Sequence, residues 1–290
     1  MLRAEAPAKI NRELRVGPRR RDGFHELLSR VVSIDLADSI EVEPAEDLKL
    51  TVQGEPVPAD STNLVHRAAV LLAEYLGVPP RARIRLQKTV PAGAGLGSGS
   101  ADAAVALLLL ARLWDARVAG SELLDLAERL GSDVPYFLIG GEADMAGRGE
   151  RVTNREDGPP RNLLLLVPPF PLSTAEVYAS YDREFGPSGL ALPQRLDIET
   201  SGRFFGPNDL ALPVLRSHFD MSAYLLTAAE IAADHAMSGA GSVIAMTGVP
   251  VGAAEALARR HPEARVLPCR TIGREEYRRR IHPSGGPSWT

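Results

Sequence analysis

Lysine is scarce in this chain of 290 residues, and the scarcity makes each lysine informative. Of its 33 basic residues three are lysine, Lys9, Lys49 and Lys88, and the other 30 are arginine. Arginine is therefore the default cation, and a lysine is a candidate for a role that needs a compact ammonium, such as contacting a phosphate. Cysteine is scarcer still. The single residue, Cys269, excludes a disulfide within the chain and is expected to be a buried structural thiol.

Long apolar runs are also missing. The longest, at 103–111 and 163–172, fall well short of the roughly 20 residues that span a bilayer. The first 14 residues carry charges where a signal peptide would be apolar. A formal net charge of −4 gives no reason to expect affinity for nucleic acid or anionic membranes. We therefore expect a cytoplasmic protein, a monomer or weak homodimer, whose partner is a small molecule.

The composition, 44% hydrophobic and 24% charged, is sufficient for a large core. Residues 62–76 repeat apolar side chains at helical spacing and end at Gly77, a typical C-cap, which predicts a helix. By the same patterns we expect strands at 29–36, 39–44, 48–54, 81–90, 163–167, 235–247 and 264–268, and helices at 101–114, 121–131, 173–181, 208–217, 220–233 and 251–261. The turn-rich segment 154–161 predicts a boundary between two α+β domains, 1–155 and 156–290. A Gly/Pro-rich loop is expected at 186–207 and a mobile tail at 282–290.

The strongest local signal is VPAGAGLGSGSADAA, residues 90–104, which lies between a predicted strand and a predicted helix. Its glycines are Gly93, Gly95, Gly97 and Gly99, and its hydroxyls belong to Ser98 and Ser100. Glycines let backbone amides approach an anion closely, and a helix N-terminus favours phosphate. No Gly-Lys-Ser/Thr closes the loop, so it is no Walker loop, and Glu122 opens a helix where a dinucleotide site would place its acidic residue after a second strand. A tight glycine turn with a capping serine is the structural alternative.

Three further residues are candidates on chemical grounds. Asp133 follows a predicted helix and could act as a general base, or be a solvated loop carboxylate. Lys9 could stabilise developing negative charge, or be a cation on a strand surface. His25, next to Phe24, could bind a ligand, although a lone histidine beside an aromatic is more often structural.

Several motifs resemble those of the GHMP kinases, small-molecule kinases that hold ATP phosphates on a Pro-x-x-x-Gly-Leu-Gly-Ser-type loop. They are, besides the glycine loop, APAKIN (6–11), RRRDGFHEL (19–27), GSDVPYFL (131–138) and GRGERV (147–152). These segments are most similar to the branch that phosphorylates the 2-hydroxyl of a cytidine diphosphate-linked methylerythritol for isoprenoid synthesis. The resemblance implies ATP and Mg²⁺ as cofactors. It also implies an α+β GHMP kinase fold, with a ribosomal protein S5 domain 2-like N-terminal domain, a ferredoxin-like C-terminal domain and the site in the cleft between them.

The resemblance also implies roles for individual residues. Lys9 and Asp133 match the catalytic lysine and the catalytic base of the family. ATP contacts are implied for Asn63, Lys88, Pro91, Gly93, Ala94, Gly95, Leu96, Gly97, Ser98, Gly99 and Ser100. Substrate contacts are implied for Asn11, Phe24, His25, Tyr178 and Gly239, with the histidine and the two aromatic rings beside the cytosine. No metal ligand is assigned.

The chain departs from the family pattern at a few positions. Phe24 stands where a tyrosine is usual, so the ring is kept and a hydroxyl is lost. Ala240 replaces a serine in the C-terminal glycine loop MSGAGSVIAM, and Arg12 and Glu13 occupy positions that are usually apolar. These departures bear on substrate preference. Two alternatives therefore stay open: another GHMP small-molecule kinase, and a non-catalytic nucleotide-binding sensor with the same fold.

Overall fold

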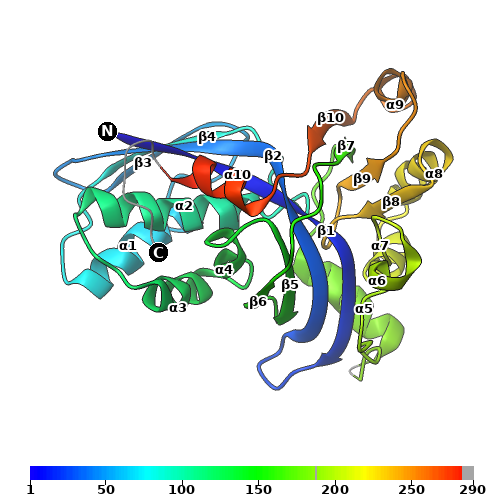
Figure 1. Cartoon of the computed structure of the whole chain (residues 1–290), viewed down its shortest axis with the longest axis horizontal. Coiled ribbons are helices and arrows are strands. Elements are labelled where there is room, and N and C mark those ends of the chain that lie inside the picture. Colours follow the sequence, from blue (N-terminus) through cyan, green and yellow to red (C-terminus); the bar gives the residue numbers. More distant parts are fainter. Residues whose placement is uncertain (187, 283–290) are drawn as a thin grey trace.

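The molecule is organised around one long antiparallel hairpin. The computed structural model describes residues 1–186 and 188–282, and in it β1 (Leu2–Arg19) pairs with β2 (His25–Glu43). Strand β1 begins in the first lobe and runs on between the two lobes to the turn of the hairpin, and β2 returns beside it to the first lobe (Figure 1). Their register shifts between Pro7 and Lys9 and again between Asn11 and Glu13. Such bulges bend a strand and re-aim its side chains, and these two flank the polar residues of APAKIN.

The first lobe is a mixed sheet covered by helices. Its strand order is β3-β4-β2-β5-β6, with β1 added on β2, and only β3 and β4 run parallel. The further strands are β3 (Lys49–Gly54), β4 (Arg83–Lys88), β5 (Glu142–Gly147) and β6 (Arg151–Asn154). The helices are α1 (Leu64–Leu76), α2 (Ser98–Leu113), α3 (Gly120–Leu130) and α4 (Val134–Phe137). Helix α2 is buried almost throughout and packs against β1 and β2, as its Ala/Leu-rich sequence predicts.

The second lobe holds a four-stranded antiparallel sheet in the order β10-β7-β9-β8. Its strands are β7 (Asn162–Val167), β8 (Asp234–Met237), β9 (Ile244–Thr247) and β10 (Arg265–Arg270). Its helices are α5 (Thr174–Phe185), α6 (Ile198–Ser201), α7 (Ala211–Ser217), α8 (Met221–Ile231) and α9 (Ala253–Arg260). The two lobes lie on either side of the β1–β2 hairpin (Figure 1).

The end of the described chain returns to the first lobe. Helix α10 (Arg274–Ile281), which the sequence did not predict, packs against β1, and Tyr277 and Ile281 belong to the same core cluster as α2. The Tyr277 hydroxyl donates to the Phe137 carbonyl at 2.7 Å. The expected division at 155/156 lies between β6 and β7, and α10, although it follows this point in the sequence, packs against β1 of the first lobe. Most of the expected tail, residues 283–290, lies outside the described residues.

The predicted helix at 62–76 is confirmed together with its ends. Asn63 lies in extended conformation and its side chain accepts from the Val65 N–H at 2.9 Å, while Gly77 ends the helix with φ of 66°. The Asn63 amide also donates to the Pro58 carbonyl at 2.6 Å. The capping function therefore accounts for the Asn63 side chain.

Lys88 is buried beneath the N-terminal part of α2, where its ammonium forms ion pairs with Asp38 and Asp102. This corrects the expectation that Lys88 faces the nucleotide phosphates. Burial raises the pKa of Asp102 to about 8, even though Lys88 opposes that shift. Lys88 on β4 is thus enclosed by two buried carboxylates, one on β2 and one on α2. Sequence spacing does not reveal these contacts, because they form between distant segments.

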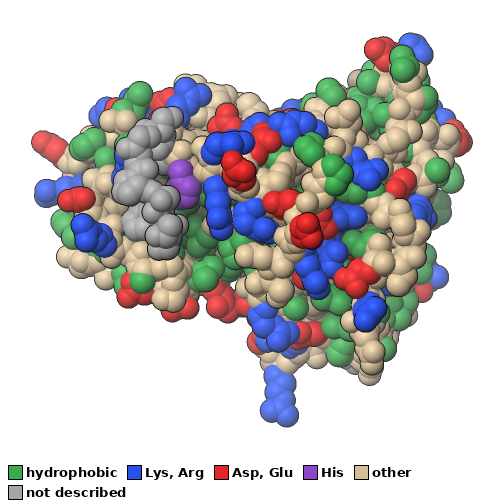
Figure 2. Space-filling model, viewed as in Figure 1, with side chains coloured by type: hydrophobic (Ala, Val, Ile, Leu, Met, Phe, Trp, Pro, Cys, Tyr) green, Lys and Arg blue, Asp and Glu red, His purple; other side chains and the backbone are tan. Residues whose placement is uncertain are grey.

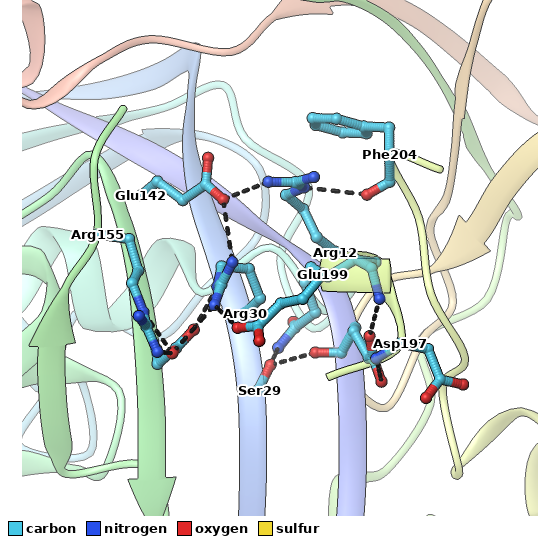
Figure 3. Close-up of polar contacts among 12 residues, drawn as sticks. Arg12, Ser29, Arg30, Glu142, Arg155, Asp197, Glu199 and Phe204 are labelled. Carbon is cyan, nitrogen blue, oxygen red and sulfur yellow. Dashed lines mark hydrogen bonds and ion pairs between the residues drawn. The ribbon is translucent and has the colours of Figure 1, made fainter. Parts of the chain in front are cut away.

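The loop at 186–207 is anchored by the two residues that depart from the family pattern. The carboxylate of Glu13, 1% exposed, accepts from the N–H groups of Asp197 at 3.1 Å and Ile198 at 3.0 Å. Arg12 donates to the Phe204 carbonyl at 3.0 Å, lies over the Phe204 ring and pairs with Glu142 (Figure 3).

The same anchor continues into a network of alternating charges. Arg30 bonds Asp144 and donates to Glu199 at 2.7 Å, and Arg155 donates to Asp144 at 2.6 Å (Figure 3). Basic and acidic side chains accordingly intermix across the middle of the molecule (Figure 2). Arg12 and Glu13 thus connect the loop to β1.

No helix in residues 1–186 and 188–282 combines the length and the apolar character needed to cross a membrane.

The position of α10 leads to a prediction about stability. Tyr277→Ala should lower the free energy of unfolding by about 3–5 kcal/mol, because it empties a fully buried aromatic site. Tyr277→Phe, which removes only the hydrogen bond to Phe137, should cost about 1 kcal/mol. Urea unfolding measures both, with the half-exposed Tyr75→Ala as control. Equal small losses at 277 and 75 would show that α10 is not part of the core.

The buried carboxyl of Asp102 leads to a prediction about pH. Its raised pKa means that the folded protein keeps a proton that the unfolded chain has released above pH ~4, so the contribution of this carboxyl to stability falls as the pH rises from 4 towards 8. Asp102→Asn lacks this contribution and should gain stability relative to the unchanged protein between pH 5 and pH 8. Thermal unfolding at both pH values, with the exposed Asp47→Asn as control, measures the difference. A difference that stays constant with pH would contradict the assignment.

Candidate active site

A cavity of about 990 Å³ brings together almost all the residues that the sequence analysis selected. The first lobe contributes the β1–β2 hairpin, the glycine loop and the beginnings of α2 and α4 to its wall. The second lobe contributes α5 and the loop after β8. The selected residues on its wall are Lys9, Asn11, Phe24, His25, Pro91, Gly93 to Ser100, Asp133, Tyr178 and Gly239. Asn63 and Lys88 do not line it.

The glycine loop needs glycine because of its backbone and its neighbours. Gly95 and Gly97 have φ of 82° and 68°, in the left-handed region. A Cβ on Gly95 would lie 2.1 Å from the Ser238 carbonyl oxygen, and one on Gly97 would lie 2.7 Å from the Phe137 ring. The loop is therefore packed too closely on the second lobe and on α4 to carry side chains at these positions.

Three hydrogen bonds hold the loop by its carbonyl groups. The Lys9 N–H donates to Leu96 at 3.0 Å, the Val243 N–H donates to Ala94 at 3.2 Å, and the Ser238 hydroxyl donates to Gly95 at 2.9 Å. Gly97 brings no side chain to cap α2, so N–H groups of the first helical turn remain available to an anion. With the Ser98 and Ser100 hydroxyls beside them, these donors fit the phosphates of a nucleotide.

Lys9 and Asp133 face each other at the middle of the cavity. The Lys9 ammonium is 5% exposed and lies 3.5 Å from Asp133 Oδ2. It also donates to Asn11 Oδ1 at 2.6 Å, and Asn11 donates to the Ser29 hydroxyl at 2.8 Å. Ser29 in turn donates to the Glu13 carbonyl at 2.7 Å, so a chain of hydrogen bonds fixes the ammonium. Asp133 precedes α4, and its side chain is about one third exposed to the cavity.

Few groups in the cavity could hold a metal ion. No cluster of three or more His, Cys, Asp or Glu side chains suited to a metal occurs within the described part of the chain. Asp133 and the hydroxyls of Ser98 and Ser100 are the oxygen donors nearest the phosphate cradle. Mg²⁺ commonly takes one or two carboxylates and completes its shell with phosphate and water, so this small donor set fits a nucleotide-bound Mg²⁺.

The far end of the cavity is aromatic. The His25 ring stacks on Tyr178, with centroids 5.4 Å apart and planes 29° apart, and meets the edge of Tyr181 at 5.3 Å. Burial raises the pKa of the Tyr178 hydroxyl well above its ordinary value, so this group stays protonated. Phe24 is 49% exposed, and the guanidinium of Arg148 lies 5.3 Å from its ring centroid. These rings can hold a flat apolar group such as a nucleobase.

The C-terminal glycine loop closes the cavity from the second lobe. Asn208 donates to the carbonyls of Met237 and Gly239, both at 2.8 Å, and accepts from the Leu210 N–H at 2.9 Å. Ser238 accepts from the Asn11 N–H at 3.2 Å, so the loop is joined to β1 as well as to the glycine loop before α2. Gly239 and Ala240 line the cavity between these contacts. Arg12 and Glu13 are not on its wall, so their departure from the family pattern concerns the anchored loop at 186–207.

Sequence reasoning missed several polar residues of the wall, among them Ser29, Arg148 and Asp182. Ser29 reaches Asn11 only through the pairing of β1 and β2, which spacing does not reveal. Arg148 lies inside the GRGERV motif, and Asp182 follows Tyr178 by four residues on α5, which places both on one face. For Arg148 and Asp182, therefore, the sequence did contain a signal.

Comparison with known proteins agrees with this geometry. The family described as the GHMP kinases N terminal domain matches residues 63–141. A 4-diphosphocytidyl-2-C-methyl-D-erythritol kinase of Pelotomaculum thermopropionicum is 40% identical over 213 residues, 73% of this chain and 72% of the relative. The enzyme of the same name from Symbiobacterium thermophilum is 43% identical over 183 residues, 62% of this chain and 64% of the relative.

Solved structures extend the likeness to nearly the whole chain. A crystal structure of 4-(cytidine 5'-diphospho)-2C-methyl-D-erythritol kinase is matched with a TM-score of 0.76 and 35% identity, over 93% of this chain and 99% of that one. The mevalonate kinase of Methanococcus jannaschii is matched with a TM-score of 0.64 at 13% identity, over 93% and 98%, which shows a common fold. The chain belongs to the 4-diphosphocytidyl-2-C-methyl-D-erythritol kinase family of the GHMP kinases.

Proposed function

We propose that the protein transfers the γ-phosphoryl group of ATP to the 2-hydroxyl of 4-diphosphocytidyl-2-C-methyl-D-erythritol, a step of the non-mevalonate route to isoprenoid precursors. The observation that supports this most directly is the placement of Lys9 and Asp133 between an anion cradle and an aromatic pocket. A substrate with a nucleobase at one end and an alcohol at the other could place its base in the aromatic pocket and its hydroxyl beside Asp133. The similarity to kinases of this name supports the same assignment.

The side chains suggest how each step would proceed. Asp133 accepts the proton of the 2-hydroxyl, and the hydroxyl oxygen forms a bond to the γ-phosphorus while the bond to the β-phosphate oxygen breaks, which releases ADP. Lys9, fixed by Asn11, neutralises the charge that grows on the phosphoryl oxygens. The amides of the glycine loop hold the β- and γ-phosphates in line. Bound Mg²⁺ would supply additional positive charge between the phosphates.

At the other end, the structure suggests how the cytosine would be held. Tyr178 and Phe24 provide rings, and His25 lies against Tyr178. Phe24 has no hydroxyl, but Arg148 over its ring supplies a cation–π contact that restricts the ring. Stacking therefore does not need the tyrosine that is usual at position 24.

Catalysis by Asp133 is tested by removing its basic oxygen without changing its shape. Asp133→Asn should lower kcat by about 10²–10⁴-fold, because an amide cannot take the proton. The Kd for ATP, measured without Mg²⁺, should be nearly unchanged, since the loop amides and not this carboxylate form the cradle. Coupled ADP release with the cytidyl substrate gives kcat, and calorimetry gives Kd. Unchanged turnover by this variant would rule out Asp133 as the base.

The wild-type protein in the same assay separates the alternatives. Turnover of homoserine or mevalonate, but not of the cytidyl substrate, would indicate another GHMP kinase. ATP binding without turnover of any alcohol would indicate a sensor.

The lysine argument gives a second test. Lys9→Arg keeps the charge but should reduce kcat by about 10²-fold or more, because the buried space between Asn11, Asp133 and Gly97 fits an ammonium and not a guanidinium. Lys49→Arg, on an exposed position of β3, is the matched control and should be silent. Equal activity of the two variants would contradict the special role of Lys9 and leave the assignment of Asp133 intact.

A further inference from the structure

We propose that Asp182 is a positioning residue, which holds the His25 imidazole for recognition of the nucleobase. The proposal rests on the proposed function for the identity of the ligand. Its physical basis, the His25–Asp182 contact, is independent of any ligand.

His25 is held through both ring nitrogens. The residue is 5% exposed, and Nδ1 lies 3.0 Å from the Gly17 carbonyl oxygen on β1. Nε2 lies 3.1 Å from Asp182 Oδ1 on α5. A carbonyl oxygen can only accept, so the ring donates from Nδ1. Asp182 Oδ1 is the acceptor atom that faces the other ring nitrogen.

Asp182 is the group on which this arrangement depends. His25 Nε2 and Asp182 Oδ1 are both buried and lie 3.1 Å apart, and neither forms a hydrogen bond of regular geometry, with each other or with a further group, in the described part of the chain. Each is therefore the available partner of the other, and loss of the carboxylate would leave a buried ring nitrogen without an acceptor. The other oxygen of Asp182 faces Arg19 at 3.5 Å, near the tip of the hairpin, which orients the carboxylate.

The contact also joins the two lobes at the base-binding end. Tyr178 and Asp182 are four residues apart on α5, so one helix face supplies both the ring that stacks on His25 and the carboxylate that meets its edge. Gly17 and His25 belong to the hairpin of the first lobe. The Gly17 carbonyl faces Nδ1 and Asp182 faces Nε2, so the histidine ring is held in one orientation. Its backbone and ring therefore present one fixed surface to the cavity. We therefore expect affinity for the cytidyl substrate to depend on Asp182, and phosphoryl transfer itself not to.

The kinetic test uses Asp182→Ala and Asp182→Asn in the full-length protein. Asp182→Ala should raise the KM for the cytidyl substrate about tenfold, because a buried donor loses its acceptor, while kcat and the KM for ATP stay close to those of the unchanged protein. Asp182→Asn, whose amide oxygen can still accept from Nε2, should recover most of that loss. Glu176→Ala, an exposed acid on the same helix, is the control and should change none of these values. A rise in both KM values together, or a loss without recovery in Asp182→Asn, would overturn the positioning role.

A measurement without substrate keeps the proposal separate from the proposed function. In ¹⁵N-labelled protein, with the ring nitrogens of His25 assigned by comparison with His25→Gln, Asp182→Ala should change the Nε2 signal of His25 and not the signals of the other five histidines. An unchanged Nε2 signal would refute the contact. If the wild-type protein does not phosphorylate the cytidyl substrate, the proposed function fails, and the nitrogen spectrum still decides whether Asp182 holds His25.

Discussion

The structure depends on a row of polar side chains at alternate positions of β1. Lys9, Asn11 and Glu13 are buried and Arg15 is partly buried, and each is hydrogen-bonded or ion-paired. A buried charge is tolerated only when it is paired, so Lys9 and Glu13 fix the position of their partners as firmly as the partners fix theirs. Lys9 positions itself against Asp133, Glu13 holds the loop at 197–198, and Arg15 bonds Asp209 at 2.9 Å. One strand thereby locates the Lys9–Asp133 pair and the second lobe relative to each other.

The two glycine loops add a second constraint, which is steric. Gly95 approaches Ser238 so closely that any side chain would collide with backbone, and the Ser238 hydroxyl bonds both the loop before α2 and β1. The phosphate cradle is therefore shaped by the second lobe as well as by its own sequence. This explains why a loop that carries few side chains can still have one defined conformation.

The departures from the family pattern fall into two kinds once they are placed in space. Phe24 and Ala240 lie on the cavity wall, where each removes a hydroxyl from the surface that a substrate would meet. Arg12 and Glu13 lie away from it and replace apolar packing by ion pairs and backbone hydrogen bonds to the segment 197–206. Only the first pair can alter substrate contacts directly. The second pair attaches the segment 197–206 to β1 by polar contacts in place of apolar ones.

Elements whose signals are local could be predicted from the amino-acid sequence. The glycine loop before α2, the capped helix at α1 and the candidates Lys9 and Asp133 were readable because each rests on residue type and spacing within a few positions. Tertiary structure decided what depends on distant partners. The position of Lys88 just before the glycine loop favours a contact with phosphate, yet Asp38 and Asp102 enclose its ammonium. Helix α10 carries two core residues among charges and needs the first lobe to bury them. Asp182 meets His25 only because α5 crosses the hairpin, since pairing of buried groups across the chain is fixed by packing and not by local propensity.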